Sequence, residues 1–242
     1  MENISQNLQK IEQRIQSACE KSGRNREEVK LLLATKTVEP KRIKSAFLAG
    51  YTLIAENKIQ ELKEKFEALK DVPHKSHFIG HLQTNKIKEI LKYDVSCIES
   101  LDRLRLAEKL QKRLEFEDKT MDVLIQVNTS FEESKFGSSP ENAINLVKAV
   151  AQMDRIRIKG LMTIGLFSAD AEKVRKCFQL LKSIQQKIIE ENIPNVEMRE
   201  LSMGMSGDLE IAIEEGATIV RVGTAVFGKR KYPDSYYWNE SK

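Results

Sequence analysis

Hydrophobic residues follow a helical spacing at the start of the chain and gather into short, strand-like runs beyond it. Residues 2–20 place Ile4, Leu8, Ile11 and Ile15 at helical spacing with polar residues between them, which predicts an amphipathic helix that ends near Gly23. Beyond it, short apolar runs typical of strands alternate with longer segments of helical composition. The eight predicted strands span residues 31–36, 51–56, 77–80, 95–100, 121–128, 156–165, 198–204 and 218–228.

This alternation predicts the fold class. Strands that alternate with helices favour a parallel sheet, and eight such units favour closure into a single (β/α)8 TIM barrel, here with an extra N-terminal helix. The 242 residues are close to the roughly 250 of one such barrel, so we expect one domain over residues 1–242. An open doubly wound sheet is the alternative fold, but no G-x-G-x-x-G follows the first predicted strand.

Composition agrees with a protein that buries a sizeable core. The chain is 40% hydrophobic and 31% charged, as in ordinary globular proteins. No apolar stretch approaches the roughly 20 residues of a membrane helix, and the first residues do not resemble a secretory signal. We therefore expect a cytoplasmic protein without membrane contact. We also expect a monomer. Cys19, Cys97 and Cys177 are far apart and form no C-x-x-C pair, so we expect buried thiols.

Charge and histidine patterns point to no further partner. The net charge of +4 comes from 40 basic and 36 acidic residues that are interleaved as on solvated helix faces, so no nucleic acid is expected. The one basic cluster, residues 228–232, is too short to change this. His74, His77 and His81 straddle a predicted strand without a cysteine or carboxylate at a familiar ligand spacing, so no metal site is expected. The remaining candidate chemistry lies at the strand ends.

In such a barrel the functional face is formed by the carboxyl ends of the strands. Polar residues collect there in this sequence. They are Lys36, Glu56 with Asn57, His81 with Gln83, Glu99, Asn128, Thr163, Ser202 with Ser206, and Arg221 with Thr224.

Lys36 closes the first predicted strand. If it points inward with Leu32 and Ala34, by the two-residue period of a strand, its amine lies in a confined and partly dry mouth. Desolvation disfavours the ammonium form and so supplies the neutral amine that carbonyl chemistry requires. From its position alone, a lysine that extends from a strand end into solvent is the simpler interpretation.

The last two strand ends carry features of an anion site. Ser206 is the predicted N-cap of the helix that follows residues 201–204, where backbone amides are exposed. Gly223 lets the backbone approach a ligand closely, and Thr224 offers a hydroxyl. These loops are the usual phosphate position of such barrels, although a helix cap and a packing glycine explain each feature separately. Pyridoxal phosphate, a phosphate-bearing aldehyde, would satisfy both these loops and Lys36.

The sequence resembles the pyridoxal phosphate homeostasis proteins, which are barrels similar to the N-terminal domain of alanine racemases. The segments that carry the resemblance span most of the chain, and the last of them is the most specific. They are residues 34–36, 55–61, 77–86, 127–137, 160–165 and 201–228. Within them the chain departs from the family at Ala55 and Lys58, where a glycine and an aromatic residue are more common, and at Phe131, where a glycine is usual.

The resemblance implies a role for each candidate binding residue. Lys36 would carry the cofactor as an imine, Ser206, Gly223 and Thr224 would bind its phosphate, and Asn57 and Met203 would lie near the ring. Arg221 shares an inward face with Gly223, so it would reach either the phosphate or the pyridine nitrogen, and both options stay open.

The resemblance implies a non-catalytic carrier or buffer of pyridoxal phosphate, with cofactor-requiring apoenzymes as its recipients. Racemases similar to this barrel take a second acid or base from an additional domain, and we expect none here. An arginine beside the pyridine nitrogen would also weaken the electron sink that amino-acid chemistry needs. The alternatives are an amino-acid racemase or related enzyme, and a regulatory module that binds a protein or RNA.

Overall fold

The eight predicted strands form one closed parallel sheet in the computed structural model, which describes residues 3–228. Each strand pairs with the next, and β8 pairs with β1 to close the barrel, which confirms the predicted fold class. The strands are β1 (Lys30–Ala34), β2 (Leu53–Glu56), β3 (Lys75–Phe78), β4 (Val95–Leu101), β5 (Met121–Gln126), β6 (Ile156–Met162), β7 (Val196–Ser202) and β8 (Ile219–Val222).

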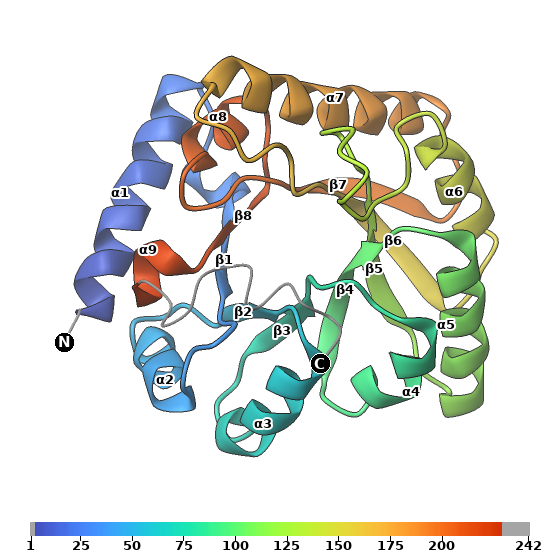
Figure 1. Cartoon of the computed structure of the whole chain (residues 1–242), viewed down its shortest axis with the longest axis horizontal. Helices are drawn as coiled ribbons and strands as arrows, with labels where there is room; N and C mark the ends of the chain where they lie inside the picture. The colour runs from blue at the N-terminus through green and yellow to red at the C-terminus, as the bar shows by residue number, and fades with distance from the viewer. Residues whose placement is uncertain (1–2, 229–242) are drawn as a thin grey trace.

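Helices surround this barrel on its outside (Figure 1). The α-helices are α1 (Ile4–Lys21), α2 (Pro40–Leu48), α3 (Ile59–Leu69), α4 (Ile87–Ile90), α5 (Leu104–Glu117), α6 (Ala143–Val150), α7 (Ala171–Glu190), α8 (Leu209–Glu214) and α9 (Thr224–Phe227). Two short 3-10 helices, η1 (Arg26–Glu28) and η2 (Thr84–Lys86), complete the set.

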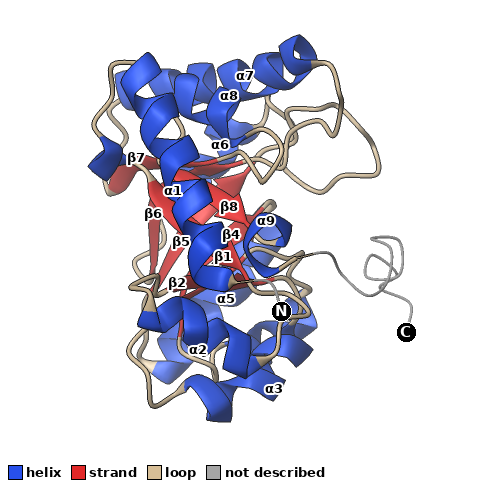
Figure 2. Ribbon diagram, turned by 90° about the vertical axis from the view of Figure 1, so that its left-hand side faces the viewer, coloured by secondary structure: helices blue, strands red, loops and turns tan. Residues whose placement is uncertain are grey.

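The predicted N-terminal helix is confirmed as α1. It begins after Asn3, whose side chain accepts a hydrogen bond from Gln6 N at 3.3 Å. The apolar face predicted from the sequence is buried, and the helix packs against α2, α8 and α9 along the side of the barrel (Figure 2). This helix therefore connects the beginning of the chain with the elements that follow β7 and β8.

Two apolar layers stabilise the barrel. The larger one lies between the strands and the helices, where each fully buried leucine or isoleucine contributes about 1.5–3 kcal/mol. A smaller cluster takes one residue from each of six strands, namely Leu32, Ala55, Cys97, Leu124, Met162 and Ile219. Since Leu32 is in this second cluster while Leu31 and Leu33 are in the first, β1 alternates as its sequence predicts.

The predicted strand over residues 218–228 is wrong in its second half. The extended backbone stops at Val222, and α9 begins at Thr224 after Gly223. Val226 N and Phe227 N both donate to Gly223 O, and both side chains are buried. The β-branched residues of this segment favour a strand by propensity, but the packing of α9 against α1 outweighs that preference.

Three further expectations concern the whole chain. Cys19, Cys97 and Cys177 are buried free thiols, as predicted. Within residues 3–228, no helix combines the length and the apolar character that crossing a membrane requires. Residues 229–232, which make up most of the basic cluster noted in the sequence, lie outside the described residues.

Candidate functional site

Apart from Arg221, which lies within β8, the predicted binding residues follow the ends of four neighbouring strands. In the closed barrel β7, β8, β1 and β2 are consecutive, and Leu33 of β1 pairs with Val222 of β8. The loops after these strands carry Ser206, then Gly223 with Thr224, then Lys36, then Asn57. Barrel closure therefore brings the loops after the first two and the last two strands to one arc at the carboxyl ends of the strands, which we call the rim arc.

Lys36 lies two residues beyond the strand that it was expected to close. β1 ends at Ala34, Thr35 is buried, and Lys36 is a half-buried residue of the turn that follows. The next residue, Thr37, has a φ of 65°, a left-handed conformation that is uncommon for residues other than glycine. The lysine is thus held by a turn of unusual shape and not by the sheet itself.

Gly223 is required by the close approach of β8 to β1. A Cβ at this position would lie 2.9 Å from Ala34 O and 3.4 Å from Ala34 Cβ. The predicted close approach thus involves backbone of the strand that leads to Lys36. Thr224 is exposed as the first residue of α9, so its hydroxyl lies at the surface of the rim arc.

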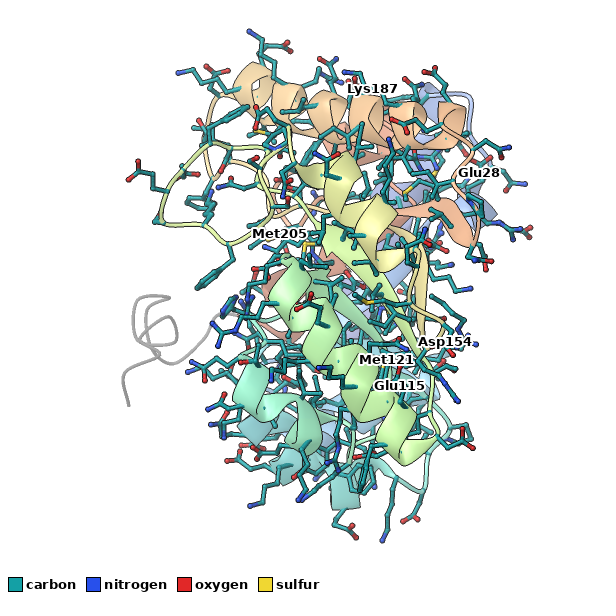
Figure 3. All side chains as sticks on the ribbon, turned by 90° about the vertical axis from the view of Figure 1, so that its right-hand side faces the viewer. Glu28, Glu115, Met121, Asp154, Lys187 and Met205 are labelled. Atoms are coloured by element: carbon teal, nitrogen blue, oxygen red, sulfur yellow. The ribbon has the colours of Figure 1, made fainter. Side chains whose placement is uncertain are left out.

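Ser206 lies in the turn between β7 and α8, but it is not the N-cap of that helix. The cap residue is Asp208, whose Oδ1 accepts a hydrogen bond from Met205 N at 2.5 Å and closes the turn. Ser206 O in turn accepts from Arg14 Nη2 at 3.0 Å. Figure 3 labels Met205 nearer one end of the barrel and Met121, the first residue of β5, nearer the other.

Arg14 braces this turn from α1. Its Nε and Nη2 also donate to the two carboxylate oxygens of Glu210 at 2.6 and 2.8 Å, so one guanidinium links α1, the Ser206 turn and α8. The Glu210 interaction raises the pKa of Arg14. Glu210 is thereby a fixed partner of Arg14 beside the rim arc.

Asn57 and Met203 differ in what they offer a ligand. Asn57 is half-buried, its backbone packs against Gly80, and its Oδ1 is buried without a hydrogen-bond partner among the described residues. Met203 has no exposed surface and belongs to the core between sheet and helices. Its placement favours support of the loop after β7 over contact with a ring.

Arg221 is buried inside the barrel at 6% exposure. Its Nη1 donates to Ser202 Oγ at 2.8 Å and its Nη2 donates to Thr163 O at 2.7 Å. Burial lowers the pKa of the guanidinium, which nevertheless stays charged at any physiological pH. The predicted inward orientation is thereby explained by two partners at the carboxyl ends of β6 and β7.

Glu99 is the buried carboxylate that compensates this cation. It accepts from Ser202 Oγ at 2.5 Å, and its other oxygen lies 2.6 Å from His77 Nδ1. Burial raises the pKa of Glu99, but the hydrogen bond and charge of His77, the charge of Arg221 and the Ser202 bond outweigh it and hold that pKa below its usual range. A connected chain of polar groups thus runs from His77 to Arg221.

Two parts of this arrangement were missed from the sequence. His77 was considered only as a metal candidate, and Lys65 of α3 was not considered at all because it lies in a segment of solvated helical composition.

The three histidines instead have separate surroundings. His74 contacts Val72 O, and His81 stacks on Phe136 with ring centroids 3.7 Å apart. The residues described by the structure hold no cluster of three or more metal-ligating side chains.

This chain is similar to known proteins over most of its length. A family model described as the N-terminal domain of alanine racemase matches residues 3–231. The pyridoxal phosphate homeostasis protein of Aquifex aeolicus is 45% identical over 230 residues, which cover 95% of this chain and 100% of that protein. The protein of the same name from Pasteurella multocida is 37% identical over 231 residues and covers 95% and 98%.

Solved structures are similar to this chain in fold. PipY of Synechococcus elongatus, solved with pyridoxal phosphate bound, is 27% identical with a TM-score of 0.80 and covers 93% of this chain and all of that one. An alanine racemase of Clostridium difficile is 13% identical with a TM-score of 0.75 over 97% of this chain and 58% of that chain, a likeness of fold alone. The chain belongs to the pyridoxal phosphate homeostasis protein family and has the barrel of the alanine racemase N-terminal domain.

Proposed function

We propose that this chain binds pyridoxal phosphate, attaches it covalently to Lys36 and serves in the homeostasis of that cofactor. The observation that carries the proposal is the rim arc, on which a half-buried lysine adjoins the loops of Ser206, Gly223 and Thr224. The bound cofactor supplies an aldehyde for the lysine and a phosphate for the loops. Backbone amides and hydroxyls at such loops are suited to phosphate.

The other residues fit the same molecule. Asn57 Oδ1 is a buried acceptor without a partner within residues 3–228, which suits a hydroxyl donor on a ring. The Arg221 guanidinium is bonded to Ser202 and Thr163 near the barrel interior, so we assign it to the ring nitrogen and not to the phosphate. Met203 is assigned to support of the β7 loop because it is fully buried.

This assignment of Arg221 favours a carrier. A guanidinium donates hydrogen bonds and never accepts one, so beside the pyridine nitrogen it would keep that nitrogen unprotonated. The electron sink that amino-acid chemistry draws upon is then weak. We propose cofactor-requiring apoenzymes as recipients and a cytoplasmic monomer as the working form.

Covalent trapping tests the proposal. Borohydride treatment after incubation with pyridoxal phosphate is expected to leave one phosphopyridoxyl group, the cofactor plus two hydrogens less one water, on the peptide that contains Lys36. Lys36→Ala should abolish this addition, whereas Lys41→Ala on α2, an exposed lysine, should leave it unchanged. Addition at other lysines with Lys36 unmodified would contradict the assignment.

The alternative is an amino-acid racemase or related enzyme, which the racemase fold favours. Turnover of alanine or another amino acid at about one per second, within the usual enzyme range, would replace the carrier by this alternative. A protein or RNA partner that binds only the cofactor-free form would instead support a regulatory module.

A further inference from the structure

A buried lysine lies behind the turn that carries Lys36. Lys65 of α3 is only 7% exposed, and its ammonium group donates to Thr35 O at 2.8 Å, Glu56 Oε1 at 2.7 Å and Glu61 Oε2 at 2.6 Å. An ammonium group has three donors, and all three are used. We call Lys65, Glu56 and Glu61 the turn cluster.

The turn cluster holds both residues that flank Lys36. On one side, Thr35 Oγ1 donates to Glu56 Oε1 at 2.6 Å while Thr35 O accepts from Lys65. On the other side, Thr37 N donates to Glu61 Oε2 at 2.6 Å. Since Thr37 is in the left-handed region, its backbone needs such a partner to stay in this conformation.

Burial and the charge of Lys65 act in opposite directions on the pKa of Glu56 in the turn cluster. Burial raises the pKa of Glu56 to about 8, an effect that the charge of Lys65 opposes and that of Glu61 reinforces. The turn cluster therefore places three titratable side chains together in a largely buried setting. Burying such a group is unfavourable unless all its members are well bonded, and apolar side chains fill such a space at lower cost. The turn cluster is therefore better explained by a need to fix the position of the Lys36 turn than by a gain in stability.

Attachment of the cofactor imposes that requirement. The Lys36 amine must add its nitrogen to the aldehyde carbon, after which a carbon–nitrogen double bond forms and the aldehyde oxygen leaves as water. The reaction depends on the placement of one nitrogen, and a shift of about 1 Å lowers the rate of such steps up to about 100-fold. The phosphate loops, in contrast, belong to β7 and β8 and do not contact the turn cluster through any of these hydrogen bonds.

We propose that Lys65, together with Glu56 and Glu61, is a positioning residue that fixes the turn of Lys36 for covalent attachment of the cofactor. This inference rests on the proposed function. It separates two steps: the phosphate loops determine how strongly the cofactor is first held, and the turn cluster determines how fast Lys36 then reacts.

The test follows attachment by absorbance after the full-length cofactor-free protein is mixed with increasing pyridoxal phosphate. Lys65→Met is expected to lower the maximal rate constant by about 10-fold, with a half-saturating concentration within about twofold of the wild-type value. Lys63→Met, an exposed lysine of the same helix, should change neither quantity. Circular dichroism is used to check that each variant is folded at the temperature of the experiment.

Glu61→Ala keeps the test decisive if Lys65→Met does not fold, because Glu61 is partly exposed and its loss removes the acceptor of Thr37 N. It should lower the maximal rate constant by at least about threefold. A wild-type rate constant in folded Lys65→Met, or in Glu61→Ala if that is the folded variant, would overturn the inference. Failure of the proposed function looks different, since the wild-type protein would then form no adduct that depends on Lys36.

Discussion

At the scale of single residues, Arg221 shows what the sequence reveals and what it conceals. The two-residue period of β8 predicted that this side chain points inward, and it does. Its partners lie 19 and 58 positions earlier in the chain, at Ser202 and Thr163, so no local pattern identifies them. Glu99 and His77 complete the network from still more distant strands.

Glu99→Gln is expected to destabilise the protein by about 3–5 kcal/mol at pH 7. The substitution leaves the buried Arg221 cation without its compensating carboxylate, and an uncompensated buried charge has a cost of that order. Urea unfolding measures the difference. The matched control is Glu133→Gln at an exposed position, for which a change within about 0.5 kcal/mol is expected.

Because the pKa of Glu99 is lowered in the folded protein, we expect the protein to lose stability in acid. The pKa of Glu99 is lower in the folded protein than its ordinary value of 4.5, so its contribution is fully present above that value. The contribution is lost as the pH falls through the lower, folded pKa. The difference between the free energies of unfolding of the wild-type protein and Glu99→Gln should therefore shrink as the pH falls below 4.5. A difference that stays constant down to pH 2 would show that Glu99 does not stabilise through its charge.

At the scale of elements, the predicted order of strands and helices is confirmed, but the ends of elements at the site differ. Lys36 lies beyond β1, Asp208 and not Ser206 caps α8, and α9 replaces the end of the last predicted strand. The start of α8 is set by the local hydrogen bond from Met205 N to Asp208 Oδ1. A tertiary contact acts at α9, because α1 packs on both α8 and α9, which lie far along the sequence from it.

Arg14→Gln tests the role of α1 in the rim arc. The change removes the charged bonds to Glu210 and the donor to Ser206 O, so the turn between β7 and α8 is held less firmly. The dissociation constant for pyridoxal phosphate should rise about three- to tenfold, which corresponds to roughly 1 kcal/mol. Equilibrium dialysis measures it.

The control for this variant is Arg113→Gln, which removes a similar ion pair with Glu117 on α5. Binding of the cofactor by this second variant should match that of the wild-type protein. Equal weakening in both variants would mean that loss of an arginine anywhere lowers affinity, and that α1 has no particular role.

At the scale of the whole molecule, closure of the barrel creates the site. Lys36 and Thr224 are separated by most of the chain, and they follow neighbouring strands because β8 pairs with β1. Eight strand-helix units predicted this closure, and with it the arc of loops. The turn cluster could not be predicted in the same way, because burial of Lys65 depends on how α3 packs beside the Lys36 turn.

Gly223→Ala tests the contact that joins the two ends of the sheet. The added Cβ would lie 2.9 Å from Ala34 O, so β1 and β8 must separate, at an expected cost of about 1–3 kcal/mol. Thermal unfolding measures this cost. Gly207→Ala is the matched control, because a Cβ there meets no atom of the described residues within 4 Å, and its melting temperature should stay close to the wild-type value.

The central claim is that Lys36 holds the cofactor, and one absorbance spectrum tests it most directly. The purified protein with pyridoxal phosphate is expected to show a band near the edge of the visible range. This band should be absent from folded Lys36→Ala and present in Lys41→Ala. An unchanged band in Lys36→Ala would contradict the account.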